Sequence, residues 1–147
     1  MTRERRTLLF LCVANSARSQ MAEGLARASA PPGWTVCSAG SNPGTLSHLA
    51  VAALGEVGID ISQHRSKGLD EVPYADADVV ITLCAEEVCP VVPATTRKLH
   101  WPLPDPARFT GTEEERLAEF RKVRDELARR IAEFWMSAAR SPQGSRS

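Results

Sequence analysis

An apolar run that ends in a cysteine constrains the fold of this chain more than any other feature. Residues 8–11, Leu-Leu-Phe-Leu, predict a buried strand, and the small polar residues after them predict a tight loop. Residues 20–26 then have the composition of a helix start. Cys12 therefore lies where a strand ends and a helix begins, which favours an α/β fold with a parallel sheet.

The loop 12–19, Cys-Val-Ala-Asn-Ser-Ala-Arg-Ser, predicts an oxyanion site. Backbone N–H groups in such a loop turn inward, and the helix adds its positive end, so a tetrahedral anion is the expected ligand. The same field favours the thiolate form of Cys12. Arg18 can offer a planar pair of donors to two anion oxygens, and Ser19 can donate to the sulfur. We predict Cys12 as the nucleophile and the following residues as the anion-binding loop: Val13, Ala14, Asn15, Ser16, Ala17, Arg18 and Ser19. The alternative, a structural cysteine beside a surface arginine, leaves the placement of the loop unexplained.

Length, charge balance and cysteine content limit the classes of protein to which this chain can belong. The chain has 147 residues, which predicts one domain over 1–140 and a disordered tail over 141–147. Lys plus Arg and Asp plus Glu balance at 18 each, so bulk charge does not indicate nucleic-acid or membrane binding. The first apolar run is too short for a signal peptide or a membrane span, so we expect a cytoplasmic protein. In that compartment the four cysteines indicate catalysis or redox chemistry.

The remaining elements alternate between strand and helix. Capping residues, turn residues and apolar spacing predict four helices: over 19–30, from Thr45 or Ser47 to 54, over 67–72 and from Thr112 onward. Short apolar runs predict strands over 34–38, 78–83 and 97–101, and a non-helical loop is expected over 102–106. The last helix is amphipathic, with apolar residues three and four positions apart. This alternation predicts a parallel sheet with right-handed crossovers.

A second cysteine follows a second buried strand. Cys84 comes after residues 78–83 as Cys12 comes after residues 8–11. In a flavodoxin-like order 2-1-3-4 these two strands are neighbours, about 4.8 Å apart, inside the Cα separation of roughly 4.4 to 6.8 Å that a disulfide accepts. Cys89 lies five residues further on, so a bond to Cys84 requires a helix there to unwind.

Three motifs together resemble one family. The loop 12–19, residues 82–84 with Cys89 and Pro90, and Asp105-Pro106 resemble the thioredoxin-coupled arsenate reductases of the low-molecular-weight tyrosine phosphatase superfamily, over residues 7–135. The resemblance implies a single-domain α/β fold of the flavodoxin-like type, with a four-stranded parallel sheet in the order 2-1-3-4 flanked by helices. It also implies these roles: Cys12 as nucleophile, Arg18 as anion clamp, Asp105 as general acid, and Cys84 and Cys89 as a redox relay.

The resemblance further implies the reaction. Arsenate would form an adduct with Cys12 and leave as arsenite when Cys84 attacks the sulfur, and Cys89 would then free Cys12. Thioredoxin would supply the electrons, with no bound cofactor and a monomeric enzyme. Some members bind potassium near the loop asparagine, which makes Asn15, Glu23 and Ser38 the candidate ligands.

Two alternatives stay open. A tyrosine phosphatase on the same fold would hydrolyse phosphate monoesters through a phospho-Cys12 intermediate, but it needs an aromatic-walled cleft, and residues 105–108 are Asp-Pro-Ala-Arg with a single tyrosine, Tyr74, in the chain. A protein that binds metal or arsenite through its cysteines would place Arg18 where it repels the cation.

Two further residues have more than one interpretation. Cys37 is interpreted as a small buried residue rather than a redox partner. His64 is either a surface residue or a hydrogen-bond partner that supports Asn15.

Overall fold

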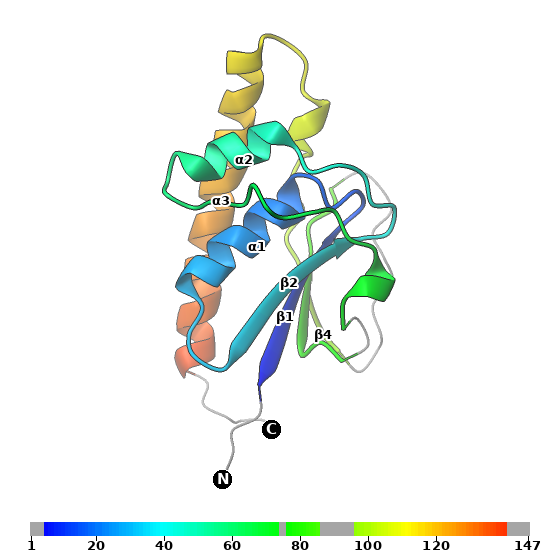
Figure 1. Ribbon diagram of the computed structural model, residues 1–147. Helices are drawn as coiled ribbons and strands as arrows, with labels where there is room; N and C mark the ends of the chain where they lie inside the picture. The colour runs from blue at the N-terminus through cyan, green and yellow to red at the C-terminus, as the bar shows by residue number, and fades with distance from the viewer. Residues whose placement is uncertain (1–4, 74–75, 86–95, 141–147) are drawn as a thin grey trace.

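The computed structural model describes residues 5–73, 76–85 and 96–140 (Figure 1). Its regular elements are β1 (Arg6–Cys12), α1 (Arg18–Ser29), β2 (Trp34–Gly40), α2 (His48–Gly55), η1 (Leu69–Glu71), β3 (Val79–Thr82), β4 (Arg97–His100), η2 (Pro106–Arg108) and α3 (Glu113–Arg140). All strand pairs are parallel, and the strand order is β2-β1-β3-β4. The predicted fold class and the order 2-1-3-4 are therefore confirmed.

The register of the sheet brings the ends of β1 and β3 together. Leu11 is opposite Thr82, and the N–H of Leu83 donates to the carbonyl of Leu11 at 2.9 Å. On the other side, Cys12 is opposite Gly40. Because the strands are parallel, every loop that follows a strand leaves from the same edge of the sheet.

Both faces of β1 are buried, which explains its continuous apolar run. Leu8 and Phe10 face the core formed with the helices, and α1, α2 and α3 lie on one side of the sheet (Figure 1). Leu9 and Leu11 face the opposite side, where the segment that carries η1 packs against them through Leu69. The apolar stripe predicted for α3 is buried at Phe120, Val123, Leu127, Ile131 and Phe134.

Capping side chains determine where the helices begin. Ser47, one of the two predicted candidates, caps α2 by accepting from the N–H groups of Leu49 and Ala50 at 3.2 and 3.4 Å. Thr112 and Glu115 form the predicted capping box at the start of α3.

Two predicted elements have different bounds in the structure, and the predicted tail lies outside the described residues. The helix expected over 67–72 is only the single turn η1. The loop expected to be non-helical through 106 ends one residue earlier, because Asp105 accepts from the N–H of Ala107 and starts η2 at Pro106. The tail 141–147 lies outside the described residues. No helix in the described part is long and apolar enough to cross a membrane.

Candidate active site

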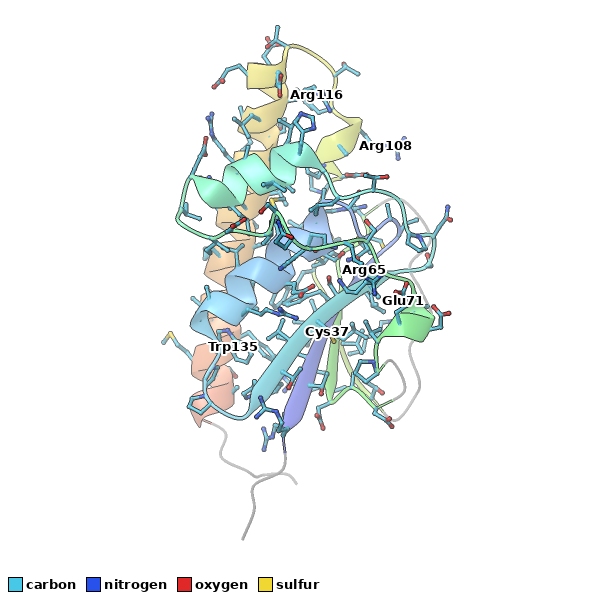
Figure 2. The ribbon with its side chains drawn as sticks, in the orientation of Figure 1. Cys37, Arg65, Glu71, Arg108, Arg116 and Trp135 are labelled. Carbon is cyan, nitrogen blue, oxygen red and sulfur yellow. The ribbon has the colours of Figure 1, made fainter. Side chains whose placement is uncertain are left out.

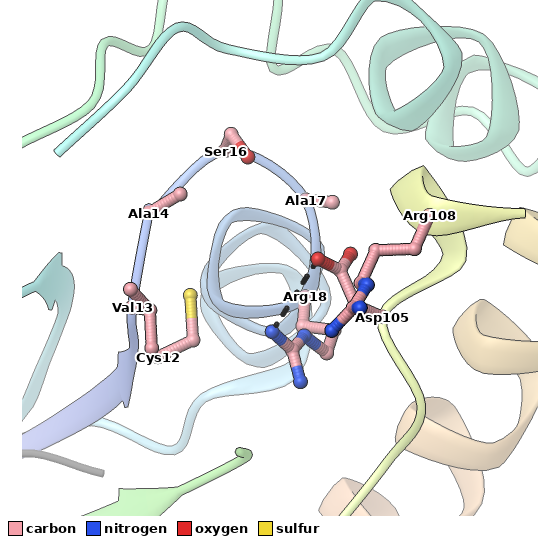
Figure 3. Close-up of a pocket in the computed structure, with 8 residues that line it drawn as sticks. All are labelled: Cys12, Val13, Ala14, Ser16, Ala17, Arg18, Asp105 and Arg108. Atoms are coloured by element: carbon pink, nitrogen blue, oxygen red, sulfur yellow. Dashed lines mark ion pairs between the residues drawn. The ribbon is translucent and has the colours of Figure 1, made fainter. Parts of the chain in front are cut away.

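A small pocket lies at the edge of the sheet where β1 passes into α1 (Figure 3). Its volume is about 140 Å³, and it is lined by Cys12, Val13, Ala14, Ser16, Ala17, Arg18, Asp105 and Arg108. The loop curves around the start of α1, with Cys12 on one side of the pocket and Arg18 and Asp105 on the other (Figure 3). The pocket therefore combines a thiol, a run of backbone amides and two guanidinium groups.

Two hydrogen-bond donors meet the sulfur of Cys12, a residue that is only 2% exposed. Ser19 Oγ lies 2.9 Å from Cys12 Sγ, and the N–H of Asn15 donates to the same sulfur at 3.2 Å. Asn15 Nδ2 donates to Ser19 Oγ at 2.7 Å, so the hydroxyl proton of Ser19 is directed at the sulfur. Donors that converge on a sulfur stabilise its thiolate form, which is the reactive form in nucleophilic catalysis.

Asn15 holds the shape of the loop. It has φ +52°, in the left-handed region that asparagine tolerates better than most residues. Its Oδ1 accepts from the backbone N–H of Lys67 at 2.8 Å, and its Nδ2 donates to Ser19 and to Ser38 Oγ at 3.0 Å. Both ends of the buried amide are thus satisfied, which makes the loop rigid before any ligand binds.

A chain of contacts behind Asn15 was only partly predictable. Gln20 Nε2 donates to Asn15 Oδ1 at 3.0 Å, and His64 Nδ1 lies 2.9 Å from Gln20 Oε1. Because Gln20 presents an oxygen to His64, Nδ1 of the neutral ring carries the proton. Burial lowers the pKa of His64 below its ordinary value and favours this neutral form. His64 thus supports Asn15 through Gln20 rather than directly, and no sequence signal identified Gln20.

Close approach of β2 to the loop depends on a glycine. A Cβ placed on Gly40 would overlap the carbonyl oxygen of Val13 and would lie 2.9 Å from the N–H of Asn15. The backbone of residues 42 and 44 also bonds to the loop, since Asn42 and Gly44 donate to the carbonyls of Val13 and Ala14 at 2.8 and 2.9 Å. These bonds occupy the carbonyls of Val13 and Ala14 and fix the loop against the segment that follows β2.

Arg18 connects three parts of the site. Its guanidinium is buried, at 3% exposed, and Nη1 donates to the carbonyls of Leu83 and Leu103 at 3.3 and 3.0 Å. Its Nη2 lies 3.7 Å from Asp105 Oδ2. The side chain of Asp105 is 25% exposed, and its other oxygen accepts from the N–H of Ala107 at 3.0 Å. A carboxyl group and a fixed guanidinium therefore face the same small pocket as Cys12.

The other cysteines occupy different environments. Cys84 is 1% exposed and follows β3 by two residues, at the same edge of the sheet as Cys12. It does not line the pocket described above. Cys89 lies outside the described residues. Cys37 is buried in β2, as predicted, among residues of the sheet's other face, and burial raises the pKa of its thiol to about 11, which keeps it unreactive.

The three candidate potassium ligands contact one another and two basic side chains. Asn15, Glu23 and Ser38 do lie together, since Ser38 Oγ donates to Glu23 Oε1 at 2.5 Å. Asn15, however, turns its amide nitrogen toward Ser38, whereas potassium requires oxygen ligands. Glu23 already pairs with Arg27 at 2.8 Å and lies 3.5 Å from Lys67 Nζ. Among the described residues no group of three His, Cys, Asp or Glu side chains is arranged to hold a metal ion.

Comparison with known proteins identifies the class of protein. Residues 7–143 match the family described as low molecular weight phosphotyrosine protein phosphatase, and the chain belongs to that family. Its relatives include an arsenate reductase of Bacillus subtilis strain 168, which is 47% identical over 133 residues, or 89% of this chain and 96% of the relative.

Solved structures of arsenate reductases also resemble this chain in fold and sequence. One, described as an arsenate reductase in the phosphate binding state, has a TM-score of 0.77 and 33% identity and covers 90% of this chain and 98% of its own. Another is a thioredoxin-dependent arsenate reductase from Corynebacterium glutamicum, with a TM-score of 0.72, 30% identity and coverage of 95% of this chain and 64% of its own.

Proposed function

We propose that this protein is an arsenate reductase that converts arsenate to arsenite. The observation that carries the proposal is the register of β1 and β3, which puts Cys12 and Cys84 at one edge of the sheet. A second buried thiol next to the nucleophile's strand is needed for reduction, whereas ester hydrolysis needs only water. The names of the relatives at 40% identity and above support the same activity.

The first step is nucleophilic attack on arsenic. Arsenate binds in the loop, where backbone N–H groups and Arg18 meet its oxygens. The thiolate of Cys12 forms a bond to arsenic, and one hydroxyl leaves. Asp105 gives this hydroxyl a proton, so that it departs as water. This role is supported by the position of Asp105, which lines the pocket with its Oδ2 3.7 Å from Arg18 Nη2.

The second step transfers the electrons. Cys84, as thiolate, attacks the sulfur of Cys12 and forms a disulfide. The electron pair of the sulfur–arsenic bond passes to arsenic, which is reduced from As(V) to As(III) and released as arsenite. Cys89 then attacks Cys84, so that Cys12 becomes a free thiolate and the disulfide moves to Cys84 and Cys89.

The enzyme is restored by an external dithiol. Thioredoxin exchanges its dithiol for the disulfide of Cys84 and Cys89, and this donor is supported by the relative from Corynebacterium glutamicum, whose description includes it. Such a cycle requires a compartment that keeps thiols reduced, so the proposal includes a cytoplasmic location. A monomeric state stays a prediction.

The second candidate is a phosphotyrosine phosphatase, which the family description favours. A tyrosyl ester would require an aromatic wall to hold its ring. Among the described residues, those that line the pocket include no aromatic side chain. Tyr74, the only tyrosine of the chain, lies outside the described residues. The pocket thus fits a small inorganic anion better than a phosphotyrosine.

One pair of assays tests the proposal. Purified protein is supplied with arsenate, thioredoxin, thioredoxin reductase and NADPH, and NADPH consumption is compared with nitrophenol release from nitrophenyl phosphate. We expect arsenate-dependent NADPH consumption that Cys84→Ser abolishes, while nitrophenol release survives in that variant. Nitrophenol release without any arsenate-dependent oxidation of NADPH would establish the phosphatase instead.

The relay has a separate test. Cys89→Ser should complete one turnover per enzyme and then stop as a Cys12–Cys84 disulfide, because no third thiol remains to release Cys12. Mass spectrometry of the alkylated, digested protein identifies that bond, and quantified arsenite gives the number of turnovers. Full multiple turnover by Cys89→Ser would refute the relay.

A further inference from the structure

The wall of the pocket opposite Cys12 contains a second arginine to which the reaction above gives no role. Arg108 is exposed at the end of η2, and its side chain extends toward the part of the pocket that holds Arg18 and Asp105 (Figure 3). Its backbone is fixed relative to Asp105, because the N–H of Arg108 donates to the carbonyl of Asp105 at 3.1 Å. Arg108 therefore moves with the acid-bearing segment.

Within the part of the chain that the structure describes, no neighbouring carboxylate forms an ion pair with Arg108. Arg121, Arg124 and Arg129, like most arginines of α3, form short ion pairs with glutamates or aspartates. Arg108 forms no ion pair with any residue in the described part of the chain, and Asp105 is instead 3.7 Å from Arg18. Two guanidinium groups on one pocket of about 140 Å³ repel each other unless an anion binds between them.

The balance of charge in the pocket supports the same conclusion. With Cys12 as thiolate and Asp105 carrying the proton that its proposed acid role requires, the charges of Cys12 and Arg18 cancel, so the side chains without Arg108 have no net charge. A doubly charged oxyanion would then enter a pocket that offers it no net attraction. Arg108 makes the net side-chain charge positive on the side where the anion arrives.

We propose that Arg108 is a specificity-determining residue that binds the outward side of the oxyanion and selects inorganic arsenate over phosphate monoesters. In an in-line displacement the leaving oxygen lies opposite the attacking sulfur, so it faces Asp105 and Arg108. In arsenate this oxygen carries only a proton and can accept from a guanidinium. In a monoester it carries an organic group, which must compete with Arg108 for the mouth. This inference rests on the proposed function, whose substrate it specifies.

The test compares four proteins: the wild type, Arg108→Ala, Arg108→Lys and Arg97→Ala. Arg97 is an exposed arginine on β4, at the other end of the strands, and its loss changes the net charge equally. We expect Arg108→Ala to raise the KM for arsenate and the inhibition constant of inorganic phosphate about tenfold at low salt, with kcat within about twofold. Arg108→Lys should restore part of this loss, and Arg97→Ala should match the wild type.

Two further measurements make the result decisive. The tenfold effect should shrink at high ionic strength, and kcat/KM for nitrophenyl phosphate should stay the same or rise in Arg108→Ala. Unchanged phosphate inhibition in Arg108→Ala, or an equal loss with arsenate and nitrophenyl phosphate, would overturn the assignment.

Failure of the proposed function is distinguishable from failure of this inference. Calorimetric binding of inorganic phosphate to Cys12→Ser, with and without Arg108→Ala, requires no reduction. Weaker binding in the double variant supports Arg108 as an anion-binding residue even for a chain that reduces no arsenate. Equal binding refutes it even for an active reductase.

Discussion

The two walls of the pocket are held in different ways. The wall formed by residues 12–19 is fixed by buried side chains, with Asn15 satisfied at both ends of its amide and Cys12 accepting two hydrogen bonds. The second wall, formed by residues 105–108, is a single turn in which Pro106 is buried and Ala107 and Arg108 are exposed, and it is closed by the bond from Ala107 to Asp105. Anion binding is thus preorganised on the first wall by buried bonds between distant segments, whereas the proposed proton transfer and selection depend on a wall closed by bonds within its own turn.

The largest expected effect concerns Cys12, the proposed nucleophile of the first wall. Cys12→Ser should abolish arsenate reduction and nitrophenyl phosphate hydrolysis, because a hydroxyl is a far weaker nucleophile than a thiolate. Phosphate binding should persist, because the loop amides and Arg18 are unchanged. Measured turnover together with calorimetric binding checks both statements. Loss of phosphate binding would show that the sulfur also holds the loop in shape.

The next effect concerns Asp105, the proposed acid of the second wall. Asp105→Asn should slow adduct formation about 10²-fold, because the leaving hydroxyl no longer receives a proton. The asparagine can still accept from the N–H of Ala107, so phosphate affinity and thermal stability should stay near the wild type. Single-turnover kinetics and a melting curve give these values. A strong loss of stability would mean that the segment is structural instead.

A third variant tests how strongly Asn15 supports the first wall. Asn15→Ala should lower the free energy of unfolding by about 2–4 kcal/mol, because it leaves buried donors and acceptors unpaired. Asn15→Gly removes the same contacts but accepts φ +52° without strain, so it should be less destabilising by about 1 kcal/mol. Denaturant unfolding measures both, and Asn42→Ala is the matched control because Asn42 is exposed. Equal stability of Asn15→Ala and the control would contradict a rigid first wall.

The smallest effect is a pH dependence behind that wall. The pKa of His64 is lowered by burial from its ordinary value of 6.5, so the unfolded chain binds more protons near this pH than the folded chain does. The free energy of unfolding should therefore decrease as the pH falls from about 7.5 to about 5.5. His64→Gln should weaken this decrease, whereas His48→Gln, at an exposed position of α2, should not. An identical slope in all three proteins would exclude a contribution from His64.

The parts of the site that were predictable are those encoded in short stretches of sequence. Cys12, Arg18 and Ser19 lie within eight positions between a strand and a helix, and their grouping depends only on local backbone geometry. The parallel sheet followed from the alternation of strands and helices, whereas the strand order, which brings Cys12 and Cys84 to a common edge, was implied by the resemblance to the arsenate reductases. The potassium hypothesis stays a prediction, and no local pattern indicated that Lys67, from elsewhere in the chain, contacts its candidate ligands Asn15 and Glu23.

By itself, then, the sequence determined the α/β architecture, the capping box at Thr112, the two candidates Thr45 and Ser47 for the start of the second helix and the position of the candidate nucleophile, because strand periodicity, capping and loop composition act over a few residues. Only the tertiary structure decided that Gln20 and His64 support Asn15 and that Arg108 faces the pocket. Those contacts join segments up to about 90 residues apart, and their formation depends on how the sheet and helices pack rather than on any local pattern.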